Sequence, residues 1–378
     1  MSDPRPIRPT LATVDLSRLK GNLMALRALV GPSVGILAAV KGDAYGHGAV
    51  PVARALQAAG CEWFGVALVE EGIRLREAGI IAPILCLGGA GPGGAADAIA
   101  HRLTPVVYDL SDAERIEQEA ARRREPYGIH LKVDTGMGRL GVPLPQWEGF
   151  LDRFAGFRWL KVDGLCSHLG GAGEGVSTEE QGRRFLVALQ AARVRGFHPS
   201  LLHLANSEGA ILHPRLRFDL VRPGLALYGI HPSPATAARI SLEPVMTVTT
   251  RVLFVKDLPA GVGLCYDRRF VTPRPSRIAT LPVGYADGYP RALSNHAEVL
   301  VHGCRAPVRG TVCMDLTLVD VTDVHETVSA GDEVVLLGQQ GEERVTAEEL
   351  ARHAGTVPYE ILCGFSERVP RRHEGSAG

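Results

Sequence analysis

Several features that define specialised classes of protein are absent from these 378 residues. Lysine plus arginine and aspartate plus glutamate both number 41, so no net charge attracts a polyphosphate, which argues against nucleic-acid binding. No apolar run approaches the roughly 20 residues of a membrane span, and the first ten residues lack the apolar region of a secretory signal. We therefore expect a cytoplasmic protein that has neither a nucleic acid nor a membrane as its partner.

Cysteine is also scarce. The seven cysteines are an odd number, are scattered from Cys61 to Cys363 and include no CxxC pair. This spacing predicts neither a disulfide framework nor a thiolate zinc site, and it fits a reducing compartment. With 46% hydrophobic and 22% charged residues, the chain has the composition of a globular protein with a large core, which excludes disorder as its main state.

The first two thirds of the chain alternate short apolar runs with segments of helical spacing. Helical spacing marks residues 49–58, 111–123 and 179–195, with Ser111 or Asp112 as a candidate cap for the second. The predicted strands are residues 35–41, 63–69, 83–88, 103–109, 128–134, 161–168, 200–206 and 218–222. Because these runs are continuously apolar, the strands are expected to be parallel and buried on both faces. Eight such units predict a (β/α)8 barrel over residues 11–240, with a doubly wound open sheet as the alternative.

The pattern changes after residue 240. Apolar and polar residues alternate over 245–255, 277–283, 298–302, 316–322 and 333–337, and a short helix is predicted at 346–354. Alternation of this kind indicates antiparallel strands. We therefore predict a second, predominantly β domain over residues 241–378, with residues 1–10 packed against it.

Residues 89–94, GAGPGG, satisfy the GxGxxG pattern after a predicted strand, and Asp109 follows about 20 residues later. Read literally, this is a dinucleotide-binding fingerprint. Pro92 interrupts the loop where successive amides should face a pyrophosphate, and the match falls in the third βα unit instead of the first. The simpler interpretation is a glycine-rich barrel loop.

Polar side chains gather at the ends of the predicted strands. They are Lys41, Lys132, Arg139, His168, Asn206, Ser207 and Arg222. Reactive groups of a βα barrel lie at the carboxyl ends of its strands, so agreement among several ends favours an active site over separate surface charges.

Lys41 gives this site a chemistry. Burial lowers the pKa of a lysine, and a neutral amine is what a Schiff-base lysine needs. Neighbouring glycines, Ser207 and Tyr45 offer amides and hydroxyls to a phosphate. A lysine with a phosphate cradle in a barrel points to pyridoxal phosphate.

Longer motifs carry a resemblance to a known family. They are AVKGDAYGHG at 39–48, KVDTGMGRLG at 132–141, HLANSEG at 203–209, RPGLALYG at 222–229, LPVGYADGYPR at 281–291, GTVCMD at 310–315, VPYE and RVPR. From about residue 11 to 371 the chain resembles alanine racemase. The resemblance implies a barrel followed by a β domain, interconversion of L- and D-alanine for peptidoglycan, and a homodimer whose active sites draw on both chains.

The resemblance also implies the catalytic groups. Lys41 matches the lysine that holds the cofactor, and Tyr266 matches a tyrosine supplied by the other subunit. Inverting a Cα centre requires a proton to leave one face and another to arrive at the opposite face, which two acid–base groups can do. Because an ordinary tyrosine, with a pKa near 10, is a poor base, the family places Arg222 and His168 beside it.

Arg222 also matches the arginine that faces the pyridine nitrogen, an assignment that competes with a simple ion pair to Asp219. The matches to the family's phosphate contacts are Tyr45, Ser207, Gly224, Leu225 and Tyr359. Arg139 and the backbone of Met314 match contacts to the substrate carboxylate, and Lys132 matches a lysine that is often carbamylated. His203, Tyr285 and Asp315 are candidate supporting groups or part of the route to the site. No metal is expected.

The chain departs from the family pattern at Gly42, Cys265, Asp267 and Thr311. These positions bear on substrate access and on preference for alanine, and they remove no chemical role. Two alternatives remain from the sequence: a barrel-type pyridoxal-phosphate decarboxylase, and a non-catalytic carrier of that cofactor. The decarboxylase would oppose the pyridine nitrogen with a carboxylate, and the carrier has no use for a second domain with a tyrosine.

Overall fold

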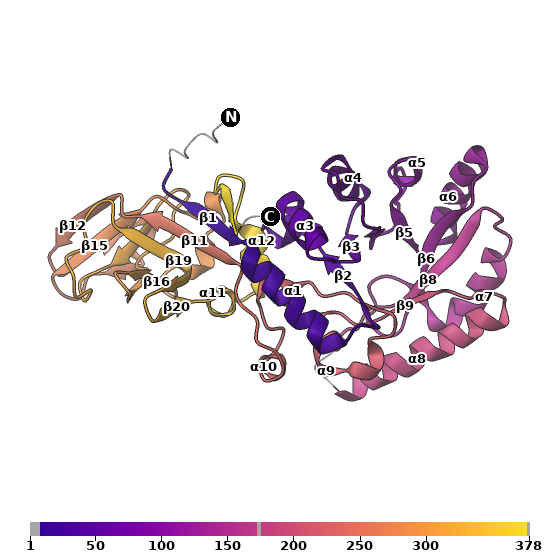
Figure 1. Cartoon of the computed structure of the whole chain (residues 1–378). Helices are drawn as coiled ribbons and strands as arrows, with labels where there is room; N and C mark the ends of the chain where they lie inside the picture. Colours follow the sequence, from indigo (N-terminus) through magenta and orange to yellow (C-terminus); the bar gives the residue numbers. More distant parts are fainter. Residues whose placement is uncertain (1–7, 172–174, 376–378) are drawn as a thin grey trace.

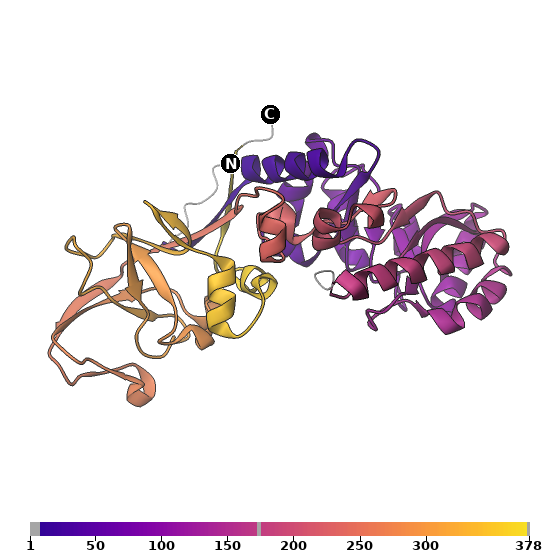
Figure 2. The ribbon, with the colours of Figure 1, turned by 90° about the horizontal axis from the view of Figure 1, so that it is seen from below.

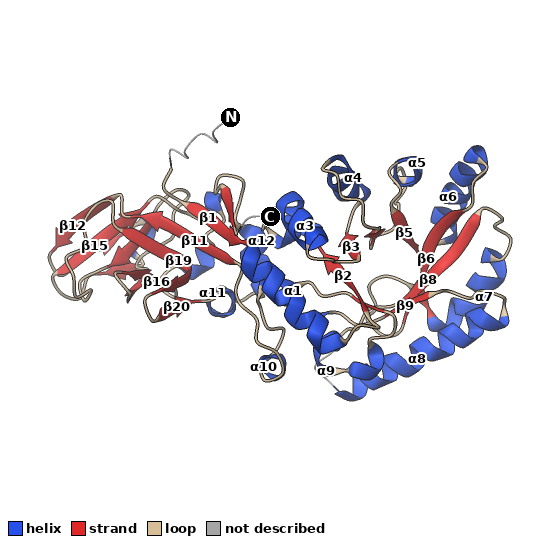
Figure 3. Ribbon diagram, in the orientation of Figure 1, coloured by secondary structure: helices blue, strands red, loops and turns tan. Residues whose placement is uncertain are grey.

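The computed structural model describes residues 8–171 and 175–375, which form two adjoining units (Figure 1). One unit is built around parallel strands with helices outside them, and the other consists mostly of strands (Figure 3). A single cluster of buried side chains, which includes Leu19, Val221, Val248 and Leu336, extends through both units. The two units therefore pack as one body instead of hanging from a linker.

The parallel sheet has the strand order β10-β2-β3-β4-β5-β6-β8-β9. Its strands are β2 (Gly35–Ala39), β3 (Trp63–Val66), β4 (Ile84–Cys86), β5 (Thr104–Val107), β6 (Tyr127–Asp134), β8 (Leu160–Cys166), β9 (Leu201–His203) and β10 (Leu220–Val221), with β7 (Val142–Pro143) beside β6. The last and first strands of this order meet, because the Asp219 and Arg222 amides donate to Leu202 and Ala205 oxygens at 3.0 and 2.9 Å. These bonds confirm the predicted barrel over the open sheet.

Helices surround this barrel and precede it. They are α1 (Leu16–Val30), α2 (Lys41–Tyr45), α3 (Ala49–Ala58), α4 (Val69–Glu77), α5 (Ala95–Ala100), α6 (Leu110–Arg123), α7 (Leu144–Phe154), α8 (Gly175–Val194), α9 (Ser207–Leu212) and α10 (Pro234–Ala237), with 3-10 turns at Pro214–Leu216 and Leu225–Tyr228. The cap of α6 is Asp109, whose carboxylate accepts from the Asp112 amide at 3.1 Å, and not Ser111 or Asp112. The structure thus gives Asp109 a capping role instead of the ribose-binding role in the dinucleotide interpretation.

The second unit contains three sheets. The main one has the order β17 (Cys304–Pro307), β16 (Glu298–Val301), β19 (Glu333–Gln340), β11 (Met246–Arg251), β1 (Leu11–Asp15) and β21 (Arg371–Glu374), with β20 (Glu343–Val345) beside β19. A second joins β12 (Phe254–Leu258), β15 (Ser276–Leu281) and β18 (Thr317–Asp320), and a hairpin pairs β13 (Gly263–Leu264) with β14 (Phe270–Val271). Two helices follow, α11 (Ala347–Ala354) and α12 (Pro358–Gly364), and short 3-10 turns lie at Tyr266–Arg268, Tyr285–Asp287 and Arg291–Leu293.

The first described strand differs from its predicted place. β1 pairs antiparallel with β11 and parallel with β21, so residues 11–15 belong to the sheet of the second unit and the barrel unit begins at α1. Residues 8 and 10 also contact this unit, since the Arg8 guanidinium binds Asp287 and the Thr10 hydroxyl bonds Thr250. From residue 8 onward, the chain therefore runs through the β unit, crosses to the barrel and returns to the β unit.

Candidate active site

A cavity of about 530 Å³ opens at the carboxyl ends of the barrel strands. Its walls come from residues far apart in the sequence. Among them are the predicted site residues Lys41, Tyr45, Lys132, Arg139, His168, Asn206, Ser207, Arg222, Gly224, Leu225 and Tyr359. The structure therefore gathers most of the predicted site in one place.

Lys41 enters the cavity at the start of a left-handed turn. The φ angles of Gly42, Asp43, Ala44 and Tyr45 are 62°, 51°, 57° and 55°. A left-handed residue other than glycine costs about 1–2 kcal/mol, so such a run needs support from outside. The Gly42 amide donates to Glu71 Oε1 at 2.7 Å, and the Ala44 amide donates to the Val40 oxygen at 2.8 Å. This tight turn lets Lys41 and Tyr45 both line the cavity.

The second unit supports this turn from behind. A Cβ added at Gly46, where φ is 80°, would overlap the Leu362 carbonyl oxygen of α12. The Arg371 guanidinium also donates to the Gly46 oxygen at 3.0 Å. This close approach brings α12 to the cavity, where its Tyr359 ring lies 5.8 Å from the Tyr45 ring.

Tyr45, Ser207 and Gly224 meet at one end of the cavity. The Ser207 hydroxyl accepts from the Gly224 amide at 2.9 Å and the Ala226 amide at 3.3 Å. A Cβ added at Gly224 would overlap the Tyr45 hydroxyl and lie 2.9 Å from ring atom Cζ. Hydroxyls and backbone thus converge where a side chain would fill the space, which is a suitable cradle for a phosphate.

Arg222 is held by the chain segments at the ends of β8 and β9. Its guanidinium donates to His203 Nδ1 at 2.7 Å, to the Ser167 oxygen at 2.6 Å and to the Leu204 oxygen at 3.2 Å, and it lies 3.2 Å from His168 Nδ1. Asp219, the alternative partner, instead accepts from the Leu202 amide at 2.8 Å. Arg222 is therefore a buried cation held mainly by neutral groups.

These contacts determine which nitrogen carries the proton in two neighbouring histidines. Because His203 Nδ1 accepts from Arg222, the proton of a neutral His203 lies on Nε2, which is 2.8 Å from His130 Nδ1. His130 must then carry its proton on Nε2, a buried atom with no hydrogen-bond partner among the described residues. Burial lowers the pKa of His130 to about 4 and that of His203 well below its usual range, so both rings stay neutral.

Positive charge concentrates around the cavity. Burial lowers the pKa of Lys41, and the positive charge of Arg139 is the next cause. The pKa of Lys132 is lowered by burial and by the positive charges of Arg222 and Arg139. The pKa of His168 is also well below its ordinary value, through burial and then Arg222. A cavity with this surplus of cationic groups suits a ligand that carries a phosphate and a carboxylate.

Tyr266 and Met314 do not line this cavity. Their side chains are 72% and 53% exposed on the β unit. The hairpin that holds Tyr266 projects from the β unit away from the barrel (Figure 2). Thr311, which departs from the family pattern, donates its hydroxyl to the Tyr266 oxygen at 3.4 Å. In a single chain, then, Tyr266 and Met314 lie apart from the Lys41 cavity, whereas Tyr359 of the same domain lines it.

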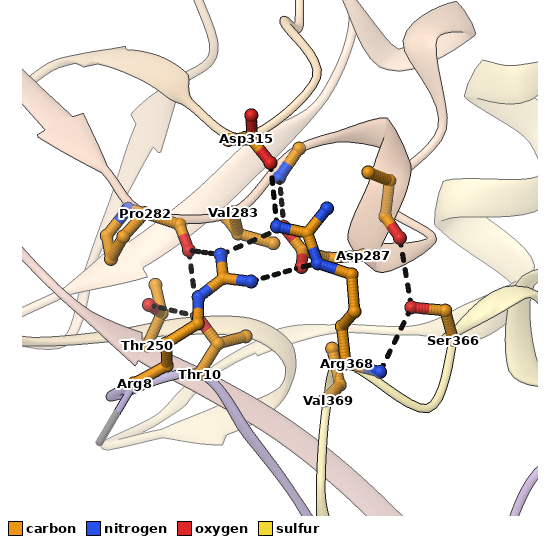
Figure 4. Close-up of polar contacts among 12 residues, drawn as sticks. Arg8, Thr10, Thr250, Pro282, Val283, Asp287, Asp315, Ser366, Arg368 and Val369 are labelled. Atoms are coloured by element: carbon orange, nitrogen blue, oxygen red, sulfur yellow. Dashed lines mark hydrogen bonds and ion pairs between the residues drawn. The ribbon is translucent and has the colours of Figure 1, made fainter. Parts of the chain in front are cut away.

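A buried carboxylate supports the segment beside Met314 (Figure 4). Asp287 accepts from Arg8 at 2.7 Å, pairs with Arg368 at 3.2 Å and accepts from the Gly284 amide at 2.9 Å. In the same turn the Ala286 amide donates to the Met314 oxygen at 3.0 Å. The conformation of the Met314 loop therefore depends on this ion cluster.

The candidate supporting residues differ in role. His203 contacts Arg222, as described above, whereas the Asp315 carboxylate pairs with Arg368 at 2.6 Å. Tyr285 is 44% exposed, and its amide donates to the Cys313 oxygen at 3.0 Å. Tyr285 and Asp315 therefore belong to the Met314 neighbourhood and not to the Lys41 cavity.

His130 and Asp287 were not singled out from the sequence. One signal for His130 was present, because it lies two residues before Lys132 in the same strand and so shares its face. Asp287 lies in the quoted motif LPVGYADGYPR, but the sequence did not show its ion pairs, since its partners Arg8 and Arg368 are far away in the chain. The glycine-rich loop at 89–94 does not line the Lys41 cavity and precedes α5, which leaves it as a barrel loop.

Comparison with known proteins agrees with this arrangement. Residues 14–232 match the family model described as the alanine racemase N-terminal domain, and residues 245–373 match the C-terminal domain. An alanine racemase of Symbiobacterium thermophilum is 46% identical over 98% of both chains, and one of Halothermothrix orenii is 42% identical over 99% of both. The chain belongs to the alanine racemase family.

Solved structures of the family have the same fold. An alanine racemase from Streptomyces lavendulae is 37% identical, with a TM-score of 0.93 over 98% of each chain. One from Bartonella henselae with covalently bound pyridoxal phosphate is 32% identical, with a TM-score of 0.86 over 97% of this chain and 99% of that one. The chain is thus an isomerase that interconverts L-alanine and D-alanine. These comparisons favour a racemase over the two alternatives from the sequence, a decarboxylase and a non-catalytic carrier. Within the described residues, no helix is long and apolar enough to cross a membrane.

Proposed function

We propose that this alanine racemase moves the α-proton with two groups on separate chains, Lys41 in its own cavity and Tyr266 from a second copy. The observation that carries the proposal is the separation of the predicted site into two parts. Lys41 lines a cavity rich in cations and hydroxyls, whereas Tyr266 is exposed on the β unit. The cavity of one chain does not contain the Tyr266 of that chain, and the exposed Tyr266 does not face the Lys41 of that chain. In a two-fold dimer, each chain would supply its Tyr266 to the cavity of the other.

Pyridoxal phosphate is the proposed cofactor. The cradle of Tyr45, Ser207 and Gly224 has no room for a further side chain and offers the hydroxyl groups of Tyr45 and Ser207 to a phosphate. Tyr359 and Leu225 complete this end of the cavity. When bound through Lys41, the cofactor stabilises negative charge on Cα of the amino acid.

The surroundings of Lys41 favour the neutral amine that its two roles require. Burial and the nearby Arg139 lower its pKa, so a neutral amine is more accessible than in an exposed lysine. A neutral amine can form the bond to the cofactor and, once released, can accept the α-proton. We assign it the D-alanine face and assign Tyr266 the L-alanine face.

In this proposal, Arg222 does not act as a proton donor. A guanidinium does not readily release a proton, and the contacts with His203 and Ser167 hold its position. We propose that it would face the pyridine nitrogen and keep that atom unprotonated. A weakly stabilised carbanion favours prompt return of a proton over competing reactions.

Arg139 and Lys132 would hold the substrate. The Arg139 guanidinium can form two parallel hydrogen bonds with the alanine carboxylate, to which the Met314 backbone of the second copy would add. The lowered pKa of Lys132 favours the neutral amine that reacts with carbon dioxide, so we propose a carbamate there that orients Arg139. An NMR carbamate signal from ¹³C-labelled bicarbonate, lost in Lys132→Arg, would support it; no signal would reject it.

The two-base assignment is tested by Tyr266→Phe. We expect racemisation to fall sharply while the visible absorption of the bound cofactor remains, because the phenol is lost and the cavity is intact. Lys41→Ala should lose both. Unchanged turnover in Tyr266→Phe would contradict the assignment.

Subunit sharing is tested by mixing two inactive variants. In a heterodimer of Lys41→Ala and Tyr266→Phe chains, one site has both wild-type groups, so random exchange should restore about one quarter of wild-type activity. Two copies of the same variant are the control. No recovery after confirmed exchange would exclude a shared site.

We further propose that the D-alanine supplies peptidoglycan synthesis and that the enzyme works in the cytoplasm. The seven cysteines, all of which are free, agree with a reducing compartment.

A further inference from the structure

Two segments of the β unit, one before Tyr266 and one before Met314, are packed against each other. A Cβ added at Gly310 would lie 3.2 Å from the Leu264 oxygen and 3.3 Å from Cys265 Sγ. The Thr311 hydroxyl donates to the Tyr266 oxygen at 3.4 Å. The β13–β14 hairpin therefore rests directly on residues 310–311.

A cysteine precedes each of the two site residues, and Cys313 lies close enough to Cys265 to be one cause of its raised pKa. Cys265 Sγ lies 3.3 Å from the position that a Cβ on Gly310 would take. Cys313 Sγ donates to the Thr311 oxygen at 3.3 Å. Both sulfurs thus lie beside residues 310–311, although the cysteines are far apart in the sequence.

The pair is suited to oxidation rather than to metal binding. Nowhere in the described ranges do three His, Cys, Asp or Glu side chains gather to hold a metal ion. Both thiols are only partly buried, so a small reagent can reach them. Burial and the neighbouring Cys313 raise the pKa of Cys265 to about 12, which keeps the Cys265 thiol protonated and slow to react under ordinary conditions.

We propose that Cys265 and Cys313 form a reversible disulfide that ties the Tyr266 hairpin to the Met314 loop and slows racemisation. Its effect on turnover rests on the role of Tyr266 proposed above. The formation of the bond does not.

The oxidant in this proposal is hydrogen peroxide. One thiol sulfur attacks a peroxide oxygen, the O–O bond breaks, and a sulfenic acid and water form. The second sulfur attacks the sulfenic sulfur, the S–O bond breaks, and a second water leaves. The two thiols lose two electrons and two protons in total, and hydrogen peroxide is reduced to two waters. A dithiol reductant reverses the change by exchange.

The bond would move the hairpin more than the loop. A disulfide requires the sulfurs to approach to about 2.05 Å, closer than a hydrogen-bond contact. The Cys313 amide donates to the Leu316 oxygen at 2.9 Å, and the Cys313 oxygen accepts from the Tyr285 amide at 3.0 Å, which anchor the loop. Cys265 has a φ of 57° and directly follows β13, in a hairpin held by only two residue pairs. We therefore expect the backbone of Cys265 to move when the disulfide forms, and Tyr266 to move with it.

The test uses the reduced holoenzyme treated with hydrogen peroxide. Free thiols are then alkylated, and peptide mass spectrometry reports links between cysteines. We expect a Cys265–Cys313 linked peptide and at least a tenfold fall in kcat, because a displacement of about 1 Å can cost about 100-fold. Dithiothreitol should restore the activity.

Cys265→Ser and Cys313→Ser should lose this response, and the basal activity of Cys265→Ser should be close to that of wild type. Cys304→Ser, which removes another half-buried thiol of the β unit, should respond like wild type. Absence of the linked peptide, or a linked enzyme with unchanged kcat, would overturn the proposal. So would equal peroxide sensitivity in Cys265→Ser. Mass spectrometry detects the disulfide whether or not the enzyme is active. The role of Tyr266 is tested separately, by the turnover of reduced Tyr266→Phe, so the two proposals can fail independently.

Discussion

Replacing Gly224 with alanine tests the phosphate cradle with a single methyl group. The φ angle of Gly224 is −117°, so the residue is not needed for a left-handed backbone. Its role is spatial, because the new Cβ would overlap the Tyr45 hydroxyl and lie 2.9 Å from Cζ. Carbon atoms in ordinary contact are about 3.5–4.0 Å apart, so the Tyr45 ring must retreat by about 1 Å.

That retreat is restricted, and its cost can be estimated. The Tyr45 ring lies 5.0 Å from the ring of Tyr228, whose hydroxyl donates to the Ala39 oxygen at 2.9 Å. A displaced Tyr45 would lose its hydrogen bond to a charged phosphate, which is worth about 1.5–3 kcal/mol. We therefore expect cofactor affinity to fall by about 10- to 150-fold in Gly224→Ala.

The assay titrates pyridoxal phosphate into apoenzyme and follows the visible absorption and the recovery of racemase activity. Gly21→Ala in α1 is the control, since no atom lies within 4 Å of the added Cβ. Adding Tyr45→Phe to Gly224→Ala should cause little further loss, because both changes remove the same contact. A folded Gly224→Ala enzyme with wild-type affinity would refute the cradle.

Two predictions concern stability. The pKa of both His47 and His130 is lowered from 6.5 to about 4 by burial, so the unfolded chain binds protons that the native chain does not between these values. Stability should therefore fall as pH drops from about 6.5 to 4, by ~2 kcal/mol per histidine at pH 5 relative to pH 7.5. Urea unfolding at the two pH values measures the loss, and His47→Gln should reduce it; an identical loss in that variant would contradict the reasoning. Asp287→Asn leaves Arg8 and Arg368 without their shared partner, and because both arginines are partly exposed we expect a loss of ~2 kcal/mol. A change in the unfolding free energy below about 0.5 kcal/mol would show that the cluster in Figure 4 does not stabilise the β unit.

The sequence determined the local structure of the barrel well. Each predicted barrel strand overlaps an observed one, and α3 covers residues 49–58 as predicted. A continuous apolar run indicates that a strand is buried on both faces. This inference needs only the residues of the strand itself. The pairing of strands in the β unit was harder to predict. Residues 245–255, which alternate as one segment in the sequence, contribute to two strands, β11 and β12, that belong to different sheets.

By itself, the sequence determined which residues should gather in one cavity, because Lys41, Ser207 and Arg222 follow buried strands whose ends must meet. Only the tertiary structure decided what those residues touch. The pairing of both β6 and β9 with β8 brings His130 within 2.8 Å of His203, and the packing of α12 against the barrel brings Tyr359 beside Tyr45. Periodicity records how deeply each residue is buried, whereas contacts between distant segments depend on how whole elements pack. For the same reason, only the folded chain shows Tyr266 outside the cavity that holds Lys41.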